Sequence, residues 1–200
     1  MAWIATVPYA RSEGGLRKLY DRIKGPGDRI DEVMLAQSLR PHLLEGHIAL
    51  QASVLDQPRN TLRRSLLETI GLWVSLLNGC GHGVAHHLAR LKRLLGDARA
   101  ESVWRALGSG APERAFAGRE LALLRYAERL TIDPASLTEA HVRALRQTGL
   151  DDGEILEANQ ATAYFAYANR AMLGLGITAE DGVPGLSRPA PDDPNDPGSR

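Results

Sequence analysis

The chain has 200 residues, within the roughly 100–200 residues of one ordinary domain, and 44% of them are apolar. That apolar content is enough to bury a core, which excludes wholesale disorder. The 24 Lys and Arg residues balance 24 Asp and Glu residues, so a formal net charge of zero argues against non-specific binding of nucleic acid. Cys80 is the single cysteine, which excludes an internal disulfide and a disulfide-stapled secreted scaffold.

The N-terminus and the apolar runs give no sign of export or membrane insertion. Residues 1–10 lack a positively charged segment ahead of a long apolar stretch. No apolar run approaches the roughly 18–20 residues of a membrane span. We therefore expect a soluble, cytoplasmic protein with no membrane partner and no nucleic-acid partner.

The C-terminal segment differs in composition from the rest of the chain. Residues 183–200 hold five of the eleven prolines and almost no apolar side chains. Such a segment buries too little surface to offset its ordering entropy. We interpret residues 1–14 as an N-terminal segment, 15–180 as one helical domain and 181–200 as a flexible Pro-rich tail. An extended arm on a neighbouring subunit is the alternative for the tail.

The remaining sequence indicates helices separated by Gly, Pro and Asp breakers, because no run alternates polar and apolar residues for long enough to predict a strand. In the first part of the chain, helices are expected over residues 14–24, 31–39, 41–55 and 61–77. After a small-residue junction at 79–83, a helix runs through His87 to residue 95, and further helices are expected over 96–107 and 113–130. The next helix begins at a cap, Ser136 or Thr138, and ends at residue 148, and the last is expected over 151–175. This predicts an all-α single domain. The apolar surface of so many short helices favours a homo-oligomer.

The helix expected over residues 61–77 carries one apolar stripe. Its apolar residues recur three or four positions apart, at Leu62, Leu66, Ile70, Trp73 and Leu77. Because no strand precedes a Gly-rich turn, the sequence offers no phosphate-binding loop, and we expect no cofactor.

Residues 68–87 gather a carboxylate, a thiol and three of the six histidines, namely Glu68, Cys80, His82, His86 and His87. Cys80 lies near the start of a new helix, where unpaired N–H groups and the helix dipole favour a thiolate. His87 follows two turns later on nearly the same face, and Glu68 approaches it if the two helices fold back on each other. The three groups then form a proton relay for thiol chemistry.

Each of these residues also has a simpler structural interpretation. A lone cysteine is often a small buried hydrophobe, and Glu68 can be an exposed helix carboxylate. His82 and His86, four residues apart, have the spacing of metal ligands, with Cys80 nearby. These alternatives stay open at the level of the sequence.

The pattern Glu68-x11-Cys80-x-His82-Gly83-x3-His87 resembles an active-site motif of a known family. The family is the alkylhydroperoxidase D-like (AhpD-like) family, in its peroxidase-related branch, within the carboxymuconolactone decarboxylase superfamily. Its motif is a Glu, eleven residues, then Cys-x-x-Cys-x-x-x-His. The resemblance covers about residues 15–178, and further supporting stretches lie at 124–131, 142–146, 152–155 and 165–176.

The resemblance implies an all-helical domain that assembles into dimers, trimers or hexamers. In the family's peroxidases a Glu–His relay lowers the pKa of the second cysteine, which attacks the hydroperoxide. The first cysteine then resolves the sulfenic acid as a disulfide, which an external thiol reduces. By position, Glu68 is the motif glutamate, Cys80 the first cysteine, His87 the motif histidine and His82 a relay histidine found in some members. Gly83 occupies the position of the attacking cysteine, so the intramolecular disulfide cycle cannot run in this chain.

Three functions follow as expectations. The first is a degenerate peroxidase-related oxidoreductase, an antioxidant that reduces a hydroperoxide through Cys80 alone and is rescued by an external thiol reductant. The second is a non-redox, decarboxylase-like enzyme in which His87, oriented by Glu68, is a general acid or base on a small carboxylic acid or lactone. The third is a non-catalytic oligomeric or metal-binding relative, with Cys80, His82 and His86 as ligands.

Overall fold

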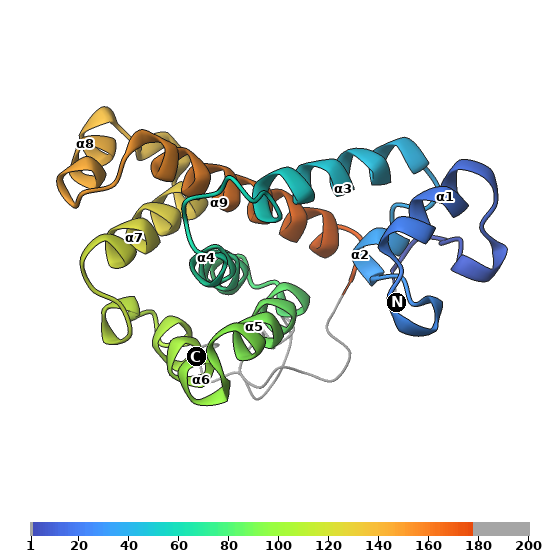
Figure 1. Cartoon of the computed structure of the whole chain (residues 1–200), viewed down its shortest axis with the longest axis horizontal. Helices are drawn as coiled ribbons and strands as arrows, with labels where there is room; N and C mark the ends of the chain where they lie inside the picture. Colours follow the sequence, from blue (N-terminus) through green and yellow to red (C-terminus); the bar gives the residue numbers. More distant parts are fainter. Residues whose placement is uncertain (1, 178–200) are drawn as a thin grey trace, which may run out of the picture.

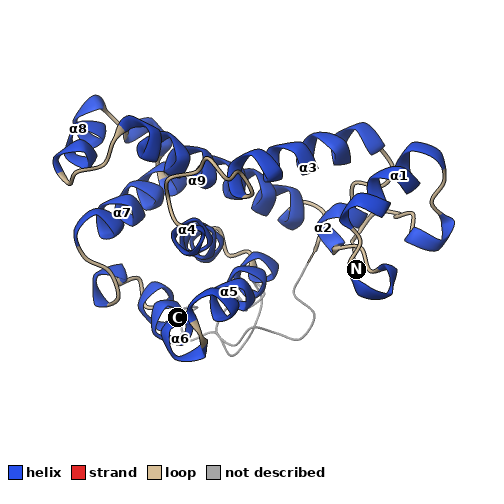
Figure 2. Ribbon diagram, in the orientation of Figure 1, coloured by secondary structure: helices blue, strands red, loops and turns tan. Residues whose placement is uncertain are grey.

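Helices make up all the regular structure of residues 2–177, the part of the chain that the computed structural model describes. Figure 2 shows them joined by loops, and these residues contain no β-strand. The α-helices are α1 (Gly14–Ile23), α2 (Glu32–Leu35), α3 (Pro41–Leu55), α4 (Arg64–Leu77), α5 (Gly81–Leu95), α6 (Asp97–Gly108), α7 (Gly118–Ile132), α8 (Glu139–Gln147) and α9 (Asp152–Leu173). Short 3₁₀ turns lie at Tyr9–Arg11, Pro26–Asp28, Pro112–Arg114 and Pro134–Ser136. The predicted all-α fold is confirmed.

Helix α4 is the centre of the fold. Figure 1 views it nearly end-on, with α9, α7 and α5 arranged around it, and all three pack against it. Every residue from Leu66 to Ser75 is buried. The prediction of a single buried stripe on this helix is therefore wrong, because neighbouring helices cover all of its faces and a helix surrounded by protein has no solvent side.

Helix ends agree with the prediction where the capping chemistry is local. The Asp151 carboxylate accepts from the backbone N–H of Glu154, and the Glu154 carboxylate accepts from the backbone N–H of Asp151. This reciprocal cap starts α9. Thr138 caps α8 in a similar way, with His141 as its partner.

Helix ends differ from the prediction where distant residues or proline decide them. The helix expected over 31–39 is only four residues long and gives way to turns over residues 36–39, and Pro41 holds Arg40 outside the helical region. The helix expected from Thr61 begins at Arg64, after a non-helical Arg63, and the backbone N–H groups of Thr61 and Leu62 bind the Glu157 carboxylate. The helix expected over 113–130 begins at Gly118, after an extended Ala117.

The N-terminal layer, which we define as α1, α2 and the turns before them, packs as a separate small cluster at the first half of α3. The buried side chains of this cluster are Leu16, Leu19, Tyr20 and Met34 of the layer and Leu44 of α3. Figure 1 shows this layer in blue beside the end of α9, and the backbone N–H of Trp3 donates to the carbonyl of Leu175 at 2.8 Å. The layer thus adds one wall beside α3, α5 and α9.

The domain boundaries at residues 14 and 180 remain predictions. The tail expected over residues 181–200 lies outside the described residues. Among the described residues, none of the helices combines the length and the apolar character that a membrane crossing requires.

Candidate acid–base site

Glu68 and His87 face each other across the α4–α5 pair. Gly79, with φ at 66°, turns the chain between these helices, which pack side by side. Glu68 is fully buried, and its Oε2 lies 2.7 Å from Nδ1 of His87. A Cβ built on Gly71 of α4 would lie 2.5–2.8 Å from three atoms of the His87 ring. A glycine at position 71 therefore lets the imidazole lie directly on the backbone of α4.

Two arginines complete the surroundings of the Glu68 carboxylate. Its Oε1 accepts from Nε of Arg64 at 2.8 Å and from Nη1 of Arg90 at 3.1 Å. Burial raises the pKa of Glu68, but the hydrogen bond and charge of His87 and the charges of Arg90 and Arg64 outweigh it and lower the pKa to about 2. An ionised carboxylate only accepts, so Nδ1 of His87 carries the proton and Nε2 presents a lone pair when the ring is neutral.

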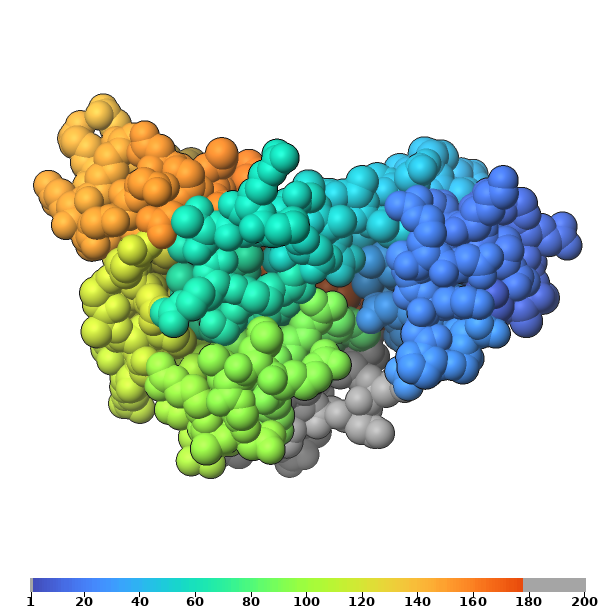
Figure 3. Space-filling model, in the orientation of Figure 1, coloured from blue at the N-terminus to red at the C-terminus, as the bar shows by residue number. Residues whose placement is uncertain are grey.

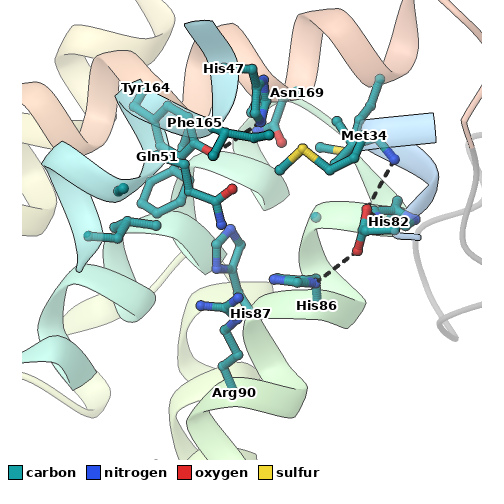
Figure 4. A pocket seen from close by; sticks show the side chains of 18 of the residues that line it. Met34, His47, Gln51, His82, His86, His87, Arg90, Tyr164, Phe165 and Asn169 are labelled. Carbon is teal, nitrogen blue, oxygen red and sulfur yellow. Dashed lines mark hydrogen bonds and ion pairs between the residues drawn. The ribbon is translucent and has the colours of Figure 1, made fainter. Parts of the chain in front are cut away.

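The ring of His87 lines a cavity of about 330 Å³ between the N-terminal layer, α3, α5 and α9. In Figure 3 the blue, teal and green regions meet around this part of the surface. Figure 4 shows the lining side chains converging from these elements. The polar and charged lining residues are Asp31, His47, Gln51, Asp56, His82, His86, His87, Arg90, Tyr164 and Asn169.

A second cluster joins α5 to the N-terminal layer. Asp31 lies 3.7 Å from Nε2 of His82 and 3.9 Å from Nδ1 of His86. Burial raises the pKa of Asp31, but the hydrogen bond with His82, the N–H of Val33 and the two histidine charges lower it to about 2. Burial together with the charges of His87 and Arg90 lowers the pKa of His86 to about 4, so this ring is neutral at neutral pH.

Cys80 is not part of the cavity lining. It is the residue before the first turn of α5, and its side chain is fully buried in the apolar core. The expected lowering of its pKa is wrong, because burial raises the pKa more than a hydrogen bond from the backbone of Gly83 lowers it. The metal hypothesis for Cys80, His82 and His86 has no support either, since no three His, Cys, Asp or Glu side chains within residues 2–177 are arranged so that they could hold a metal ion.

The space beside Gly83, where the motif has the attacking cysteine, is occupied by other side chains. A Cβ built there would lie 2.5 Å from Oγ of Ser75 and 2.9 Å from Oδ1 of Asn169. Oγ of Ser75 donates to Oδ1 of Asn169 at 3.2 Å. The glycine at position 83 is thus explained by packing, because a polar pair from α4 and α9 takes the place of a side chain on α5.

Sequence reasoning missed several residues of this site. Asp31, His47, Arg64, Arg90 and Tyr164 had no motif to mark them, and Asn169 appeared only as part of a resembling stretch. The one readable signal was the spacing of Arg64 and Glu68, four residues apart on one helix face.

Comparison with solved structures relates this fold to AhpD-like proteins. An uncharacterised peroxidase-related protein from Ralstonia eutropha JMP134, with an alkylhydroperoxidase AhpD core, superposes with a TM-score of 0.78 and 19% identity over 90% of this chain and 93% of its own. A peroxidase-related protein from Silicibacter sp. TM1040 superposes with a TM-score of 0.71 and 19% identity, over 90% of this chain and 89% of its own. The debrominase Bmp8 superposes with a TM-score of 0.67 and 17% identity, over 83% of this chain and 86% of its own. The structure of a variant of Bmp8 has been solved in complex with 2,3,4-tribromopyrrole.

No protein-family model and no curated protein matches this sequence. The structural similarity nevertheless extends over most of each chain. The chain has the fold of the AhpD-like peroxidase-related proteins, as the resemblance of its motif predicts.

Gly71→Ala is expected to destabilise the protein and displace His87. The new methyl group overlaps a ring held by Glu68 on one edge and by Phe165, whose centroid is 4.5 Å away. Overpacking of this kind costs about 1–3 kcal/mol. Urea unfolding would measure the loss, and the ring ¹⁵N shifts of His87 would report its displacement.

Gly46→Ala is the matched control. Gly46 lies within α3 and has no atom within 4 Å of the added Cβ, so alanine should stabilise the helix by up to about 1 kcal/mol. Equal effects of the two substitutions would contradict the close approach of His87 to Gly71.

The pH dependence of stability should carry the signature of Glu68. Its folded pKa of about 2 lies below the ordinary value of 4.5, so its stabilisation is present above pH 4.5 and is lost as pH falls toward 2. Glu68→Gln should lower the free energy of unfolding at neutral pH by about 3–5 kcal/mol and flatten the decline below pH 4.5. Urea midpoints across this range would measure both, with the exposed Glu139→Gln as a neutral control.

Cys80 should react slowly with iodoacetamide in the folded protein at neutral pH and readily after unfolding in urea. Burial both blocks access to the thiol and disfavours the thiolate. Mass spectrometry of timed samples would give the two rates. Rapid labelling of the folded chain with a midpoint below about pH 8.5 would contradict this assignment.

Proposed function

We propose that this protein is a non-redox enzyme of the AhpD-like, carboxymuconolactone decarboxylase type, in which His87 and Glu68 carry out acid–base chemistry on a small carbonyl-containing acid or lactone. The observation that carries the proposal is the 2.7 Å contact between Glu68 and His87 at the wall of the cavity. Among the described residues, no hydrogen bond occupies the other ring nitrogen, Nε2.

The charge arrangement suits a base that must gain and return a proton. Glu68 holds the proton on Nδ1, so Nε2 is the atom that accepts a proton from a bound substrate. The imidazolium formed in this step is stabilised by the adjacent carboxylate, whose ionised state is maintained by Arg64 and Arg90. A positioned general base of this kind contributes about 10²–10⁴-fold to a rate.

The thiol chemistry of the motif has weaker support in this chain. Cys80 is buried away from the cavity lining, and Ser75 and Asn169 fill the space beside Gly83. A hydroperoxide in the cavity would therefore meet imidazole and amide groups in place of a thiolate. The debrominase with the same fold and a bromopyrrole-bound variant is a relative whose activity is not peroxide reduction, which fits a fold that hosts several chemistries.

Thiol-dependent hydroperoxide reduction is the second candidate. The peroxidase-related proteins that share this fold favour it. In this chain it would require Cys80 to leave the core and an external thiol to reduce its sulfenic acid.

Deuterium incorporation separates the two candidates. The protein would be incubated in D₂O with γ-butyrolactone, cyclopentanone or levulinate, and exchange at the carbon next to the carbonyl would be followed by ¹H NMR. Wild type and Cys80→Ala should catalyse exchange, whereas His87→Gln should lose about 10²–10⁴-fold of the rate.

The contrary result is equally clear. If none of these probes exchanges and the protein instead consumes tert-butyl hydroperoxide with dithiothreitol in a way that Cys80→Ala abolishes, the acid–base proposal is wrong. Retention of full exchange by His87→Gln would also overturn it.

A further inference from the structure

Asn169 lines the cavity, and its side-chain amide is buried with an unused donor. It comes from the last turns of α9, and only 1% of its surface is exposed. Its Oδ1 accepts from the hydroxyl of Ser75, while its Nδ2 is buried and has no hydrogen-bond partner within residues 2–177. Native proteins leave few buried N–H groups unpaired, so such a group at a cavity points to a ligand that completes it.

The position of Asn169 relative to His87 follows from the two helices that carry them. The rings of His87 on α5 and Phe165 on α9 pack edge to face at 4.5 Å. Asn169 lies one helical turn beyond Phe165, and Gly83, which it approaches, lies one turn before His87. Four residues correspond to about 6 Å along a helix. The Asn169 amide and the His87 imidazole therefore lie about one helical turn apart on the side of the cavity that α5 and α9 form.

The remaining lining distinguishes between neutral and charged ligands. Each charged group in the wall has an internal partner: Arg90 binds Glu68, Asp56 binds Arg64, and Asp31 pairs with His82. The apolar lining is provided by Ile23, Val33, Met34, Ile48, Leu55, Phe165 and Met172. A carboxylate would gain no unpaired cation here, whereas a neutral carbonyl oxygen needs one donor and an apolar surround.

We propose that the ligand of this cavity is a neutral carbonyl compound, a ketone or lactone, whose carbonyl oxygen accepts a hydrogen bond from Nδ2 of Asn169. This inference rests on the acid–base function proposed above and narrows its substrate class. Ser75 is a positioning residue, because its hydroxyl holds Oδ1 and so directs Nδ2 away from α4. Gly83 leaves the space that this arrangement occupies.

The amide then has a defined part in the proton transfer. Nε2 of His87 takes a proton from the carbon next to the carbonyl, and the electron pair of that C–H bond forms a C=C bond. The carbonyl π pair moves to the oxygen, where the Asn169 N–H stabilises the resulting enolate. Return of the proton from the imidazolium restores a neutral carbonyl compound, so the step needs neither an oxidant nor a reductant.

Side-chain NMR of ¹⁵N-labelled protein tests the contact directly. Cyclopentanone is titrated against cyclopentane, which has the same ring without the oxygen, and against levulinate as an anionic carbonyl compound. We expect the Asn169 NH₂ resonances, assigned by their loss in Asn169→Leu, to shift with cyclopentanone and to stay unchanged with the other two.

Two variants add an affinity readout. Asn169→Leu removes the donor at similar size and should weaken cyclopentanone binding by up to about tenfold, the effect of one neutral hydrogen bond. Ser75→Ala keeps the Asn169 donor but removes the hydrogen bond that orients it. Its affinity for cyclopentanone should lie between those of wild type and Asn169→Leu, and cyclopentanone should shift its Asn169 NH₂ resonances less than in wild type. This second variant decides the matter if Asn169→Leu fails to fold.

The failure of this inference is distinguishable from that of the proposed function. If cyclopentanone shifts the His87 ring resonances but leaves the Asn169 NH₂ group and the affinity of both variants unchanged, the donor role is overturned while acid–base chemistry stands. If the Asn169 resonances shift as expected but no deuterium exchange occurs, the ligand class is supported and the proton-transfer function fails. Binding of levulinate in preference to cyclopentanone overturns the choice of a neutral ligand.

Discussion

The fully buried carboxylate of Glu68 is the interaction on which the rest of this structure depends. A buried charge on α4 is compatible with folding only if both oxygens of the carboxylate find donors and cationic groups offset the charge. Arg64, His87 and Arg90 provide those donors, and they come from both α4 and α5. The requirement to neutralise one group thus fixes the register of the two helices and, with it, the tautomer of the imidazole at the cavity.

Two glycines leave the space that neighbouring side chains of the site occupy. At position 71 the missing side chain admits the His87 ring against the backbone of α4, and at position 83 it admits the Ser75–Asn169 pair. A cysteine at position 83 would compete with that pair for the same space. Exchanging a nucleophile for an amide therefore changes the chemistry of the wall without changing the helices that build it, which is how one fold can carry different activities.

The helices were within reach of the sequence, because breakers, caps and apolar spacing are local signals. The Glu68–His87 pair was within reach because both residues belong to the motif that the sequence resembles. Asn169 was not, since its partner Ser75 lies 94 residues away and no periodicity links them. Asp31 was equally hidden, because it meets His82 only after the N-terminal layer folds onto α5. The prediction for Cys80 was wrong for a related reason: its position at a helix start favours a thiolate, but the sequence does not show its burial among apolar neighbours.

Besides α3, three parts of the structure around the cavity have separable roles. The α4–α5 pair holds the base, and its geometry is maintained by charges that lie behind the cavity, at Glu68 and Arg64. Helix α9 contributes Phe165 and Asn169, which contact a ligand without taking part in that charge cluster. The N-terminal layer adds Asp31 and Met34, attached through histidines of α5. Substitutions in α9 or in the N-terminal layer can therefore change which molecule is bound while the proton-transfer pair stays intact, whereas a change at Glu68 affects folding and chemistry together.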